Sequence, residues 1–346
     1  MRTKDDLRQL QALPLELKIG LTKRRIADWV NYYGESGVYV SFSGGKDSTV
    51  LLHMVREMFP NVEAVFVNTG LEYPEIQKFV KSFDNVTILR PKMRFDEVIK
   101  NYGYPIISKK VGRGIEFYRR GSKWAVNAMN GNHSITGEPC GFAKNMYEKW
   151  KPITEMPFMV SDKCCAVMKE KPLQQFVRET GKKPITALLA TESYRREQAW
   201  LKTGCNAFDS KSPMSKPMSF WTEQDVLQYI KKYNIPIASV YGQVVYETEP
   251  EQLRVEEYGI ENCGTEPLCT TGCKRTGCIF CAFGAHLEKE SRFERLKRTH
   301  PRQYEYCIGG GEYDENGVWK PNKQGLGMGH VFDELNKIYG DGFINY

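Results

Sequence analysis

The chain has 346 residues, of which 41% are hydrophobic and 26% are charged. This length accommodates one large α/β domain or two smaller ones, and the composition is ordinary for a soluble globular protein. Its 49 lysines and arginines against 42 aspartates and glutamates give a net charge of +7, which suits an anionic substrate without requiring nucleic acid. The apolar runs are too short to span a membrane, and the charged start MRTKDDLRQL lacks the core of a secretory signal. We therefore expect a cytoplasmic protein.

The first third of the chain alternates predicted helices with predicted strands. The segment LELKIGLTKRRIADWVNYY, residues 15–33, has apolar residues at helical spacing. Alternating strands and helices imply a parallel sheet with right-handed crossovers, so we expect a doubly wound parallel α/β fold. The predicted strands are 37–42, 63–67 and 86–89, and the predicted helices are 48–58, 74–82 and 94–102.

The pattern weakens over 108–161, a basic and aromatic stretch that we interpret as an insertion or a lid. Farther along, residues 185–190 have strand character, and 222–232 have the spacing of an amphipathic helix capped by Thr222. After residue 243 the chain becomes rich in glycine, cysteine and charge. We expect an N-terminal helical segment at 1–35, a nucleotide-binding α/β domain at 36–243 and a cysteine-rich region at 244–346.

The sequence SFSGGKDST, residues 41–49, lies where the first of these strands should give way to a helix. Backbone N–H groups at such a turn, added to the helix dipole, make an anion site. Gly44 and Gly45 would let a phosphate approach the backbone, and Lys46 supplies positive charge. The spacing is not that of G-x-x-x-x-G-K-[ST] or G-x-G-x-x-G. The residues alone leave a phosphate loop and a plain glycine-rich turn as alternatives.

Two segments resemble a known group of enzymes. Ser43-Gly44-Gly45-Lys46-Asp47-Ser48 is similar to the S-G-G-x-D-S loop of the adenine-nucleotide α-hydrolase superfamily, which includes N-type ATP pyrophosphatases and the phosphoadenosine phosphosulfate (PAPS) reductase family. The segment 68–75, NTGLEYPE, is similar to the D-T-G-x-x-F-P-E-T segment of the latter, with Asn68 and Tyr73 as departures. The resemblance implies catalytic roles for Lys46 and Asp47. It also implies nucleotide-binding roles for Ser41, Ser43, Gly44, Gly45, Lys46, Asp47, Ser48, Asn68, Thr69, Gly70 and Glu72.

A third segment, ALLATESYRRE at 187–197, matches the family pattern G-x-R-x-x-E-S-x-x-R in part. Glu192 and Arg196 fit and are implied as nucleotide-binding residues. Ala187 and Leu189 replace the glycine and the first arginine, so one substrate contact is altered. Because strand ends in open α/β sheets bind ligands, we favour a functional role for Arg196 over a merely solvated arginine.

Ten cysteines are unevenly spaced, with five of them inside 263–281. In a cytosolic chain, clustered thiols indicate a metal or an iron–sulfur cluster. Cys164-Cys165-x-x-x-Lys169 resembles the C-C-x-x-R-K segment of sulfonucleotide reductases, with Met168 in place of the arginine. The resemblance implies a [4Fe–4S] cluster on Cys164, Cys165, Cys278 and Cys281. A zinc site on Cys269, Cys273, Cys278 and Cys281 and free buried thiols are the alternatives; Cys140, Cys205 and Cys307 we interpret as structural.

Reductases of the family carry a C-terminal E-C-G-x-H segment with the nucleophilic cysteine, and we do not find it here: the 262–265 segment around Cys263 is a poor imitation. We therefore expect ATP and Mg²⁺ to support adenylylation of an acceptor, coupled to sulfur transfer with help from the cluster. The alternatives are reduction of PAPS or its unphosphorylated analogue APS, and a nucleotide-binding module without turnover. The partners implied are a sulfur donor protein or thioredoxin, and a nucleic-acid acceptor.

Overall fold

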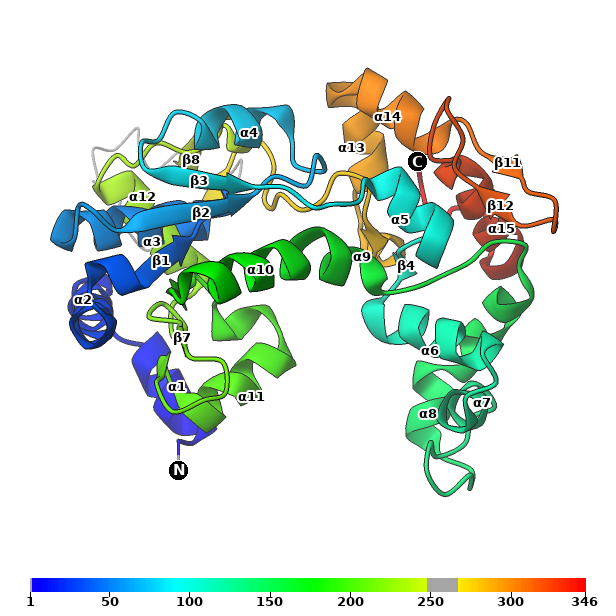
Figure 1. Cartoon of the computed structure of the whole chain (residues 1–346), viewed down its shortest axis with the longest axis horizontal. Coiled ribbons are helices and arrows are strands. Elements are labelled where there is room, and N and C mark those ends of the chain that lie inside the picture. The colour runs from blue at the N-terminus through cyan, green and yellow to red at the C-terminus, as the bar shows by residue number, and fades with distance from the viewer. Residues whose placement is uncertain (1, 248–266) are drawn as a thin grey trace, which may run out of the picture. The chain divides into compact units, whose positions relative to one another are not determined.

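The computed structural model describes residues 2–247 and 267–346 and divides the chain into two units (Figure 1). Unit 1 comprises residues 1–68, 72–89 and 173–276, and unit 2 comprises 69–71, 90–172 and 277–346. The domain borders expected at 35/36 and 243/244 stay predictions. No helix among the described residues has the length and apolar character needed to cross a bilayer.

Unit 1 is built on a six-stranded sheet with the order β3-β2-β1-β5-β7-β6. The pairs β3–β2, β2–β1, β1–β5 and β5–β7 are parallel, and β6 pairs antiparallel with β7 at the edge. The predicted parallel α/β sheet is therefore confirmed. The strands are β1 (Val38–Ser41), β2 (Glu63–Val67), β3 (Val86–Leu89), β5 (Lys183–Ile185), β6 (Asn206–Ala207) and β7 (Met214–Ser215).

Apolar side chains pack the helices against this sheet, and polar side chains cap helix ends. Phe176 packs on Tyr39 and Val65 of the sheet, with the two rings of Phe176 and Tyr39 edge to face at 5.2 Å. Thr222 caps α12 in a capping box with Asp225, as the sequence predicts. The helices of unit 1 are α1 (Lys4–Gln11), α2 (Leu15–Tyr33), α3 (Lys46–Met58), α4 (Pro74–Val80), α10 (Lys171–Thr180, which begins in unit 2), α11 (Tyr194–Thr203) and α12 (Glu223–Lys232).

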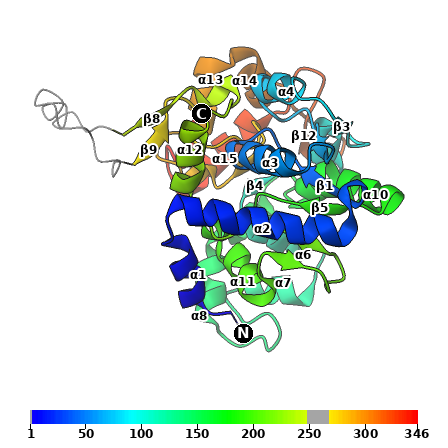
Figure 2. The same ribbon diagram turned by 90° about the vertical axis from the view of Figure 1, so that its left-hand side faces the viewer.

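Short elements complete unit 1. Among its described residues are the 3₁₀ turns η1 (Glu35–Gly37), η4 (Ala190–Glu192) and η5 (Ser239–Tyr241), and β8 (Val244–Tyr246) pairs antiparallel with β9 (Leu268–Thr270). Figure 2 shows α1, α2 and the β8–β9 pair from the side of this unit. The strand expected at 185–190 is wrong in extent, because β5 ends at Ile185 and the 3₁₀ turn η4 begins at Ala190.

Unit 2 is mostly helical. The stretch 108–161, expected as an insertion or lid, lies within its 90–172 segment and forms short helices separated by glycines and polar turns. Two small pairings, β10–β4 (parallel) and β11–β12 (antiparallel), accompany the helices. The elements are α5 (Phe95–Tyr102), β4 (Ile106–Ile107), α6 (Lys109–Arg119), α7 (Lys123–Met129), α8 (Gly141–Met146), η2 (Glu148–Glu155), α9 (Lys163–Cys165), the π-turn η3 (Ala166–Glu170), β10 (Ala282–Phe283), η8 (Ala285–Leu287), α13 (Arg292–Thr299), α14 (Pro301–Ile308), β11 (Glu312–Tyr313), β12 (Trp319–Lys320) and α15 (Met328–Tyr339).

Candidate nucleotide site and cysteine cluster

The loop 42–45 joins the carboxyl end of β1 to the amino end of α3. Gly44 has φ +71°, and a Cβ there would lie 2.8 Å from the Cγ2 atoms of Ile76 and Val80, so only glycine fits. Gly45 is the N-cap of α3 and, among the described residues, no side chain caps that helix. The amino end of α3 therefore offers helix N–H groups and the positive end of a helix dipole to an anion.

Hydroxyl groups of the loop bind its own backbone. Ser48 Oγ accepts from the N–H of Ser43 at 3.2 Å, lies 2.9 Å from Ser43 Oγ and donates to the carbonyl of Gly45 at 3.0 Å. The N–H of Gly45 in turn donates to Ser43 Oγ at 3.3 Å. These contacts fix a narrow turn in which two N–H groups are directed at hydroxyl oxygens.

Charged side chains surround Asp47, which is partly exposed in the first turn of α3. Burial raises the pKa of its carboxyl above the usual value, whereas Lys46, Arg275 and Arg196 lower it and Glu223 raises it further. These four charged residues come from α3, α11, α12 and the segment after β9. The sheet thus brings together side chains that are distant in sequence.

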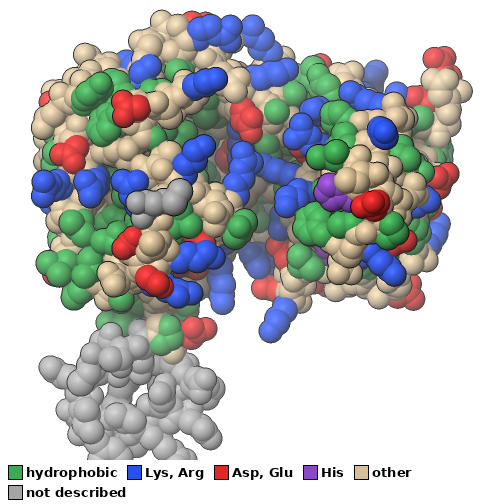
Figure 3. Space-filling view, turned by 90° about the horizontal axis from the view of Figure 1, so that it is seen from below, with side chains coloured by type: hydrophobic (Ala, Val, Ile, Leu, Met, Phe, Trp, Pro, Cys, Tyr) green, Lys and Arg blue, Asp and Glu red, His purple; other side chains and the backbone are tan. Residues whose placement is uncertain are grey.

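The cations of this group have carboxylate partners. Lys46 is 7% exposed and its Nζ lies 3.2 Å from Glu223 Oε1. Glu192 forms ion pairs with both Arg196 and Arg275. Thus the two sequence-predicted residues Glu192 and Arg196 lie in direct contact with each other. The charges of Arg196 and Asp47 also attract each other. Lysine and arginine side chains are prominent on the face of the protein shown in Figure 3.

Sequence reasoning missed Tyr241 and Thr276. The Tyr241 hydroxyl lies 2.6 Å from Thr276 Oγ1, and Lys46 Nζ lies 5.5 Å from the centre of the Tyr241 ring. A Cβ on Gly45 would be 3.4 Å from that hydroxyl, so Tyr241 stands directly over the loop. No motif marks Tyr241, and the only signal for Arg275 and Thr276 is their position just before Gly277 and Cys278.

The 68–75 segment follows β2 as predicted. Asn68 donates its N–H to the carbonyl of Leu89, Gly70 has φ +77°, and Pro74 opens α4. Thr69 and Glu72 are buried. Thr69 and Gly70 belong to unit 2, whereas Asn68 and Glu72 belong to unit 1 together with the loop and with Ser41 at the end of β1. Binding roles for these residues stay predictions.

Four cysteines meet in unit 2. Burial raises the pKa of the Cys164 thiol, and Cys278, Cys165 and Cys281 each raise it further, which places these three thiols near Cys164. Cys165 likewise raises the pKa of Cys281, after burial as the main cause. Nevertheless, no group of three or more His, Cys, Asp or Glu side chains is arranged to hold a metal ion within residues 2–247 and 267–346. The four thiols match the donor set of a cluster in number and kind.

The other cysteines divide between the units. Cys269 and Cys273, the additional ligands of the alternative zinc site, belong to unit 1, whereas Cys278 and Cys281 belong to unit 2. Cys307 is fully buried with its thiol 3.5 Å from Met328 Sδ, as expected for a structural residue. Cys263 lies outside the described residues.

Comparison with known proteins identifies the family of this chain. Residues 37–108 and 134–283 match the "Phosphoadenosine phosphosulfate reductase domain". The chain belongs to this family. Two relatives named "Adenosine 5'-phosphosulfate reductase" come from Staphylococcus haemolyticus and Lysinibacillus sphaericus. The first is 24% identical over 63% of this chain and 70% of its own length, and the second is 25% identical over 71% and 80%.

A PAPS reductase from Candida auris, solved as a phosphate complex, aligns with a TM-score of 0.37 at 15% identity, covering 76% of this chain and 96% of that one. The PAPS reductase family consists of nucleotide-related enzymes. The parallel sheet described above belongs to the adenine-nucleotide α-hydrolase-like fold of this family.

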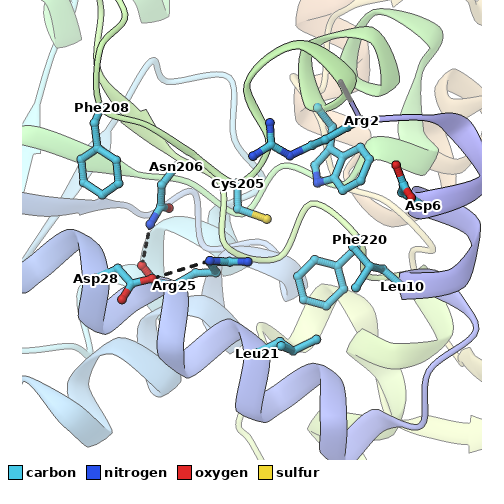
Figure 4. A pocket seen from close by; sticks show the side chains of 11 residues that line it. Arg2, Asp6, Leu10, Leu21, Arg25, Asp28, Cys205, Asn206, Phe208 and Phe220 are labelled. Atoms are coloured by element: carbon cyan, nitrogen blue, oxygen red, sulfur yellow. Dashed lines mark hydrogen bonds and ion pairs between the residues drawn. The ribbon is translucent and has the colours of Figure 1, made fainter.

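Unit 1 also contains a cavity of about 390 Å³ that is separate from the loop residues (Figure 4). Arg25, Cys205, Phe208 and Phe220 line it, and Arg25 Nη1 lies 3.7 Å from Asp28 Oδ2. Burial raises the pKa of the Cys205 thiol. Of the described residues that line this cavity, none is among those predicted to bind nucleotide.

Proposed function

We propose that this member of the PAPS reductase family uses ATP and Mg²⁺ to adenylylate an acceptor, releasing pyrophosphate, and that sulfur transfer follows. The observation that carries the proposal is the placement of Lys46, Asp47, Arg196 and Arg275 around the amino end of α3. A triphosphate carries several negative charges, and a helix amino end with three cations is suited to hold them.

In the proposed reaction, an acceptor oxygen attacks the α-phosphorus of ATP and the bond from that phosphorus to the bridging oxygen of pyrophosphate breaks. Lys46 and the loop N–H groups stabilise the charge on the leaving pyrophosphate. Asp47 would hold Mg²⁺, whose charge favours the ionised carboxylate against the effect of burial. A sulfur nucleophile then displaces AMP from the adenylylated acceptor.

The four thiols of unit 2 fit an iron–sulfur cluster in number and kind. Cys164, Cys165, Cys278 and Cys281 would hold a [4Fe–4S] cluster, which supplies electron transfer or a sulfur-binding iron when bound. Zinc on Cys269, Cys273, Cys278 and Cys281 is the alternative. A sulfur donor protein and a nucleic-acid acceptor are the partners that this reaction would require.

A second candidate function is reduction of PAPS or APS with thioredoxin as the electron source, which the names of the two bacterial relatives favour. That reaction needs a thiol that can attack the sulfur of the nucleotide. Cys307 and Cys273 are buried, at 0% and 3% exposure, and are poorly placed for such an attack. Cys269 is partly exposed, and Cys263 lies outside the described residues. The burial of Cys273 and Cys307 supports the first proposal over the second.

The deciding experiment offers the anaerobically purified protein ATP with Mg²⁺, and separately PAPS or APS with thioredoxin, and resolves the products by chromatography. AMP and pyrophosphate from ATP, absent with Lys46→Ala but retained with the exposed-site control Lys337→Ala, would support adenylylation. Release of sulfite from PAPS or APS would reject adenylylation in favour of the reductase function. Binding of nucleotide without any product would favour a non-catalytic module.

A further inference from the structure

The N–H groups at the mouth of the phosphate loop already have hydroxyl partners. The N–H of Ser43 donates to Ser48 Oγ, and the N–H of Gly45 donates to Ser43 Oγ. The phenol oxygen of Tyr241 lies over the same turn, 3.4 Å from the position that a Cβ on Gly45 would take. Two of these hydroxyls belong to the loop itself, whereas Tyr241 reaches it from η5, almost 200 residues farther along the chain.

Tyr241 is held firmly over the loop. It is 2% exposed, its hydroxyl lies 2.6 Å from Thr276 Oγ1, and its ring contacts the Lys46 ammonium. The segment that carries Thr276 is bonded to the backbone beside Tyr241, because the N–H of Gly272 donates to the carbonyl of Tyr241 at 2.9 Å. A phenol fixed by several contacts cannot leave the loop without a cost in free energy.

We propose that Tyr241 competes with the phosphate groups of the nucleotide for the amino end of α3, and so sets the affinity of this site. A phosphate oxygen that reaches the N–H groups at this end of α3 displaces the phenol oxygen from its place over the loop. The exchange is favourable because a charge-assisted hydrogen bond to phosphate is about twice as strong as one to a neutral hydroxyl. The neutral hydroxyl thus lowers the affinity of the site for every phosphate ligand. The negative charge of the phosphate still allows the ligand to bind. This inference rests on the proposed nucleotide site.

Burial raises the pKa of Tyr241 to about 12, so its hydroxyl stays protonated and neutral at physiological pH. An ionised phenol would repel phosphate and would accept the loop N–H far more strongly. A neutral phenol is therefore a weak competitor, whose removal should have a limited effect. Loss of one neutral hydrogen bond corresponds to a change of roughly three- to tenfold in the dissociation constant.

The test compares the parent with Tyr241→Phe by calorimetry, using pyrophosphate, ATP and adenosine as probes. We expect Tyr241→Phe to bind pyrophosphate and ATP roughly three- to tenfold more tightly, with the affinity for adenosine unchanged, because adenosine has no phosphate. Thr276→Val, which keeps the ring but removes the partner of its hydroxyl, should act in the same direction. The matched control is Tyr229→Phe, which removes a phenol oxygen that contacts His53 at 2.9 Å.

Weaker binding of pyrophosphate by Tyr241→Phe would show that the phenol donates to the phosphate, and would overturn the proposal. Equal binding of pyrophosphate by the two proteins would mean that Tyr241 lines the site without competing with phosphate. That result would also overturn the proposal, even if both proteins convert ATP to AMP and pyrophosphate. If neither protein binds any of the three probes, the nucleotide site itself is wrong and this inference falls with it. Thr276→Val provides the same comparison should Tyr241→Phe fail to fold.

Discussion

The ion pair between Lys18 of α2 and Asp225 of α12 gives the sharpest prediction about stability. Lys18 Nζ lies 2.8 and 2.7 Å from the two carboxylate oxygens of Asp225, and the two side chains are only 3% and 9% exposed. Lys18→Met keeps the apolar stem of the side chain but leaves the carboxylate buried without its cation. Removing one partner of a buried pair costs about 3–5 kcal/mol of unfolding free energy.

The lower end of that range applies because Asp225 keeps other hydrogen bonds. The N–H of Thr222 donates to it at 2.6 Å and the Thr222 hydroxyl at 2.8 Å. We therefore expect Lys18→Met to lower the free energy of unfolding by about 3 kcal/mol. Urea denaturation at neutral pH, followed by circular dichroism, measures this change.

The control is Lys337→Met. Lys337 also forms an ion pair, with Glu334 at 2.7 Å, but its side chain is 70% exposed. An exposed pair contributes about 0–1 kcal/mol, so this variant should unfold within about 0.5 kcal/mol of the parent. A loss below about 1 kcal/mol for Lys18→Met would refute the reasoning, because it would mean that water or a rearranged side chain satisfies Asp225.

Three further predictions concern the loop and the cysteines. Gly44→Ala should destabilise the protein by about 1–3 kcal/mol in urea, because it places a Cβ at positive φ against Ile76 and Val80. Asp47→Asn should raise the free energy of unfolding at neutral pH: the raised pKa of Asp47 means that the folded state binds the proton more tightly, so the carboxylate costs stability as the pH rises above its unfolded pKa. That gain should shrink in urea titrations at acidic pH. Cys165→Ser should lose the iron and the brown colour of anaerobically purified protein, measured by iron assay and absorbance.

Each of these has a clear contrary result. Equal stability of Gly44→Ala would mean that the loop relaxes freely around a side chain. A destabilised Asp47→Asn at neutral pH would mean that its carboxylate is stabilised by Lys46, Arg275 and Arg196 more than burial disfavours it. An iron-replete Cys165→Ser protein would remove Cys165 from the ligand set, and a Cys140→Ser variant that retains iron is the matched control.

Local sequence patterns predicted the regular part of unit 1 well. The helix α2 begins and ends where apolar spacing placed it, at Leu15 and Tyr33, and β2 and β3 have the predicted bounds. Thr222 was predicted as the cap of the helix at 222–232, and it caps α12 in the structure. The spacing of apolar residues and the helix caps are local signals, so these elements can be predicted from short stretches of sequence.

Patterns failed where contacts between distant segments decide the structure. The edge strands β6 and β7 have two residues each, too few for any periodicity, and β5 stops at Ile185 although apolar residues continue to Ala190. At the candidate site, the loop and the pair of Glu192 and Arg196 could be found by resemblance. Tyr241, Glu223 and Thr276 could not, because only the folded sheet brings η5, α12 and the segment after β9 to the loop.

The division of the chain has a consequence for how this protein could be dissected. The chain passes between the units at 68/69, 71/72, 89/90, 172/173 and 276/277, so neither unit is a continuous stretch. A truncation after residue 243 would remove both strands of the antiparallel pair β8–β9, and it would also remove Cys278 and Cys281, which lie near Cys164. Because the segments of the two units alternate along the chain, no single continuous fragment contains all of unit 1 or all of unit 2. The unit with the phosphate loop and the unit with the four thiols therefore have to be expressed together, as one chain.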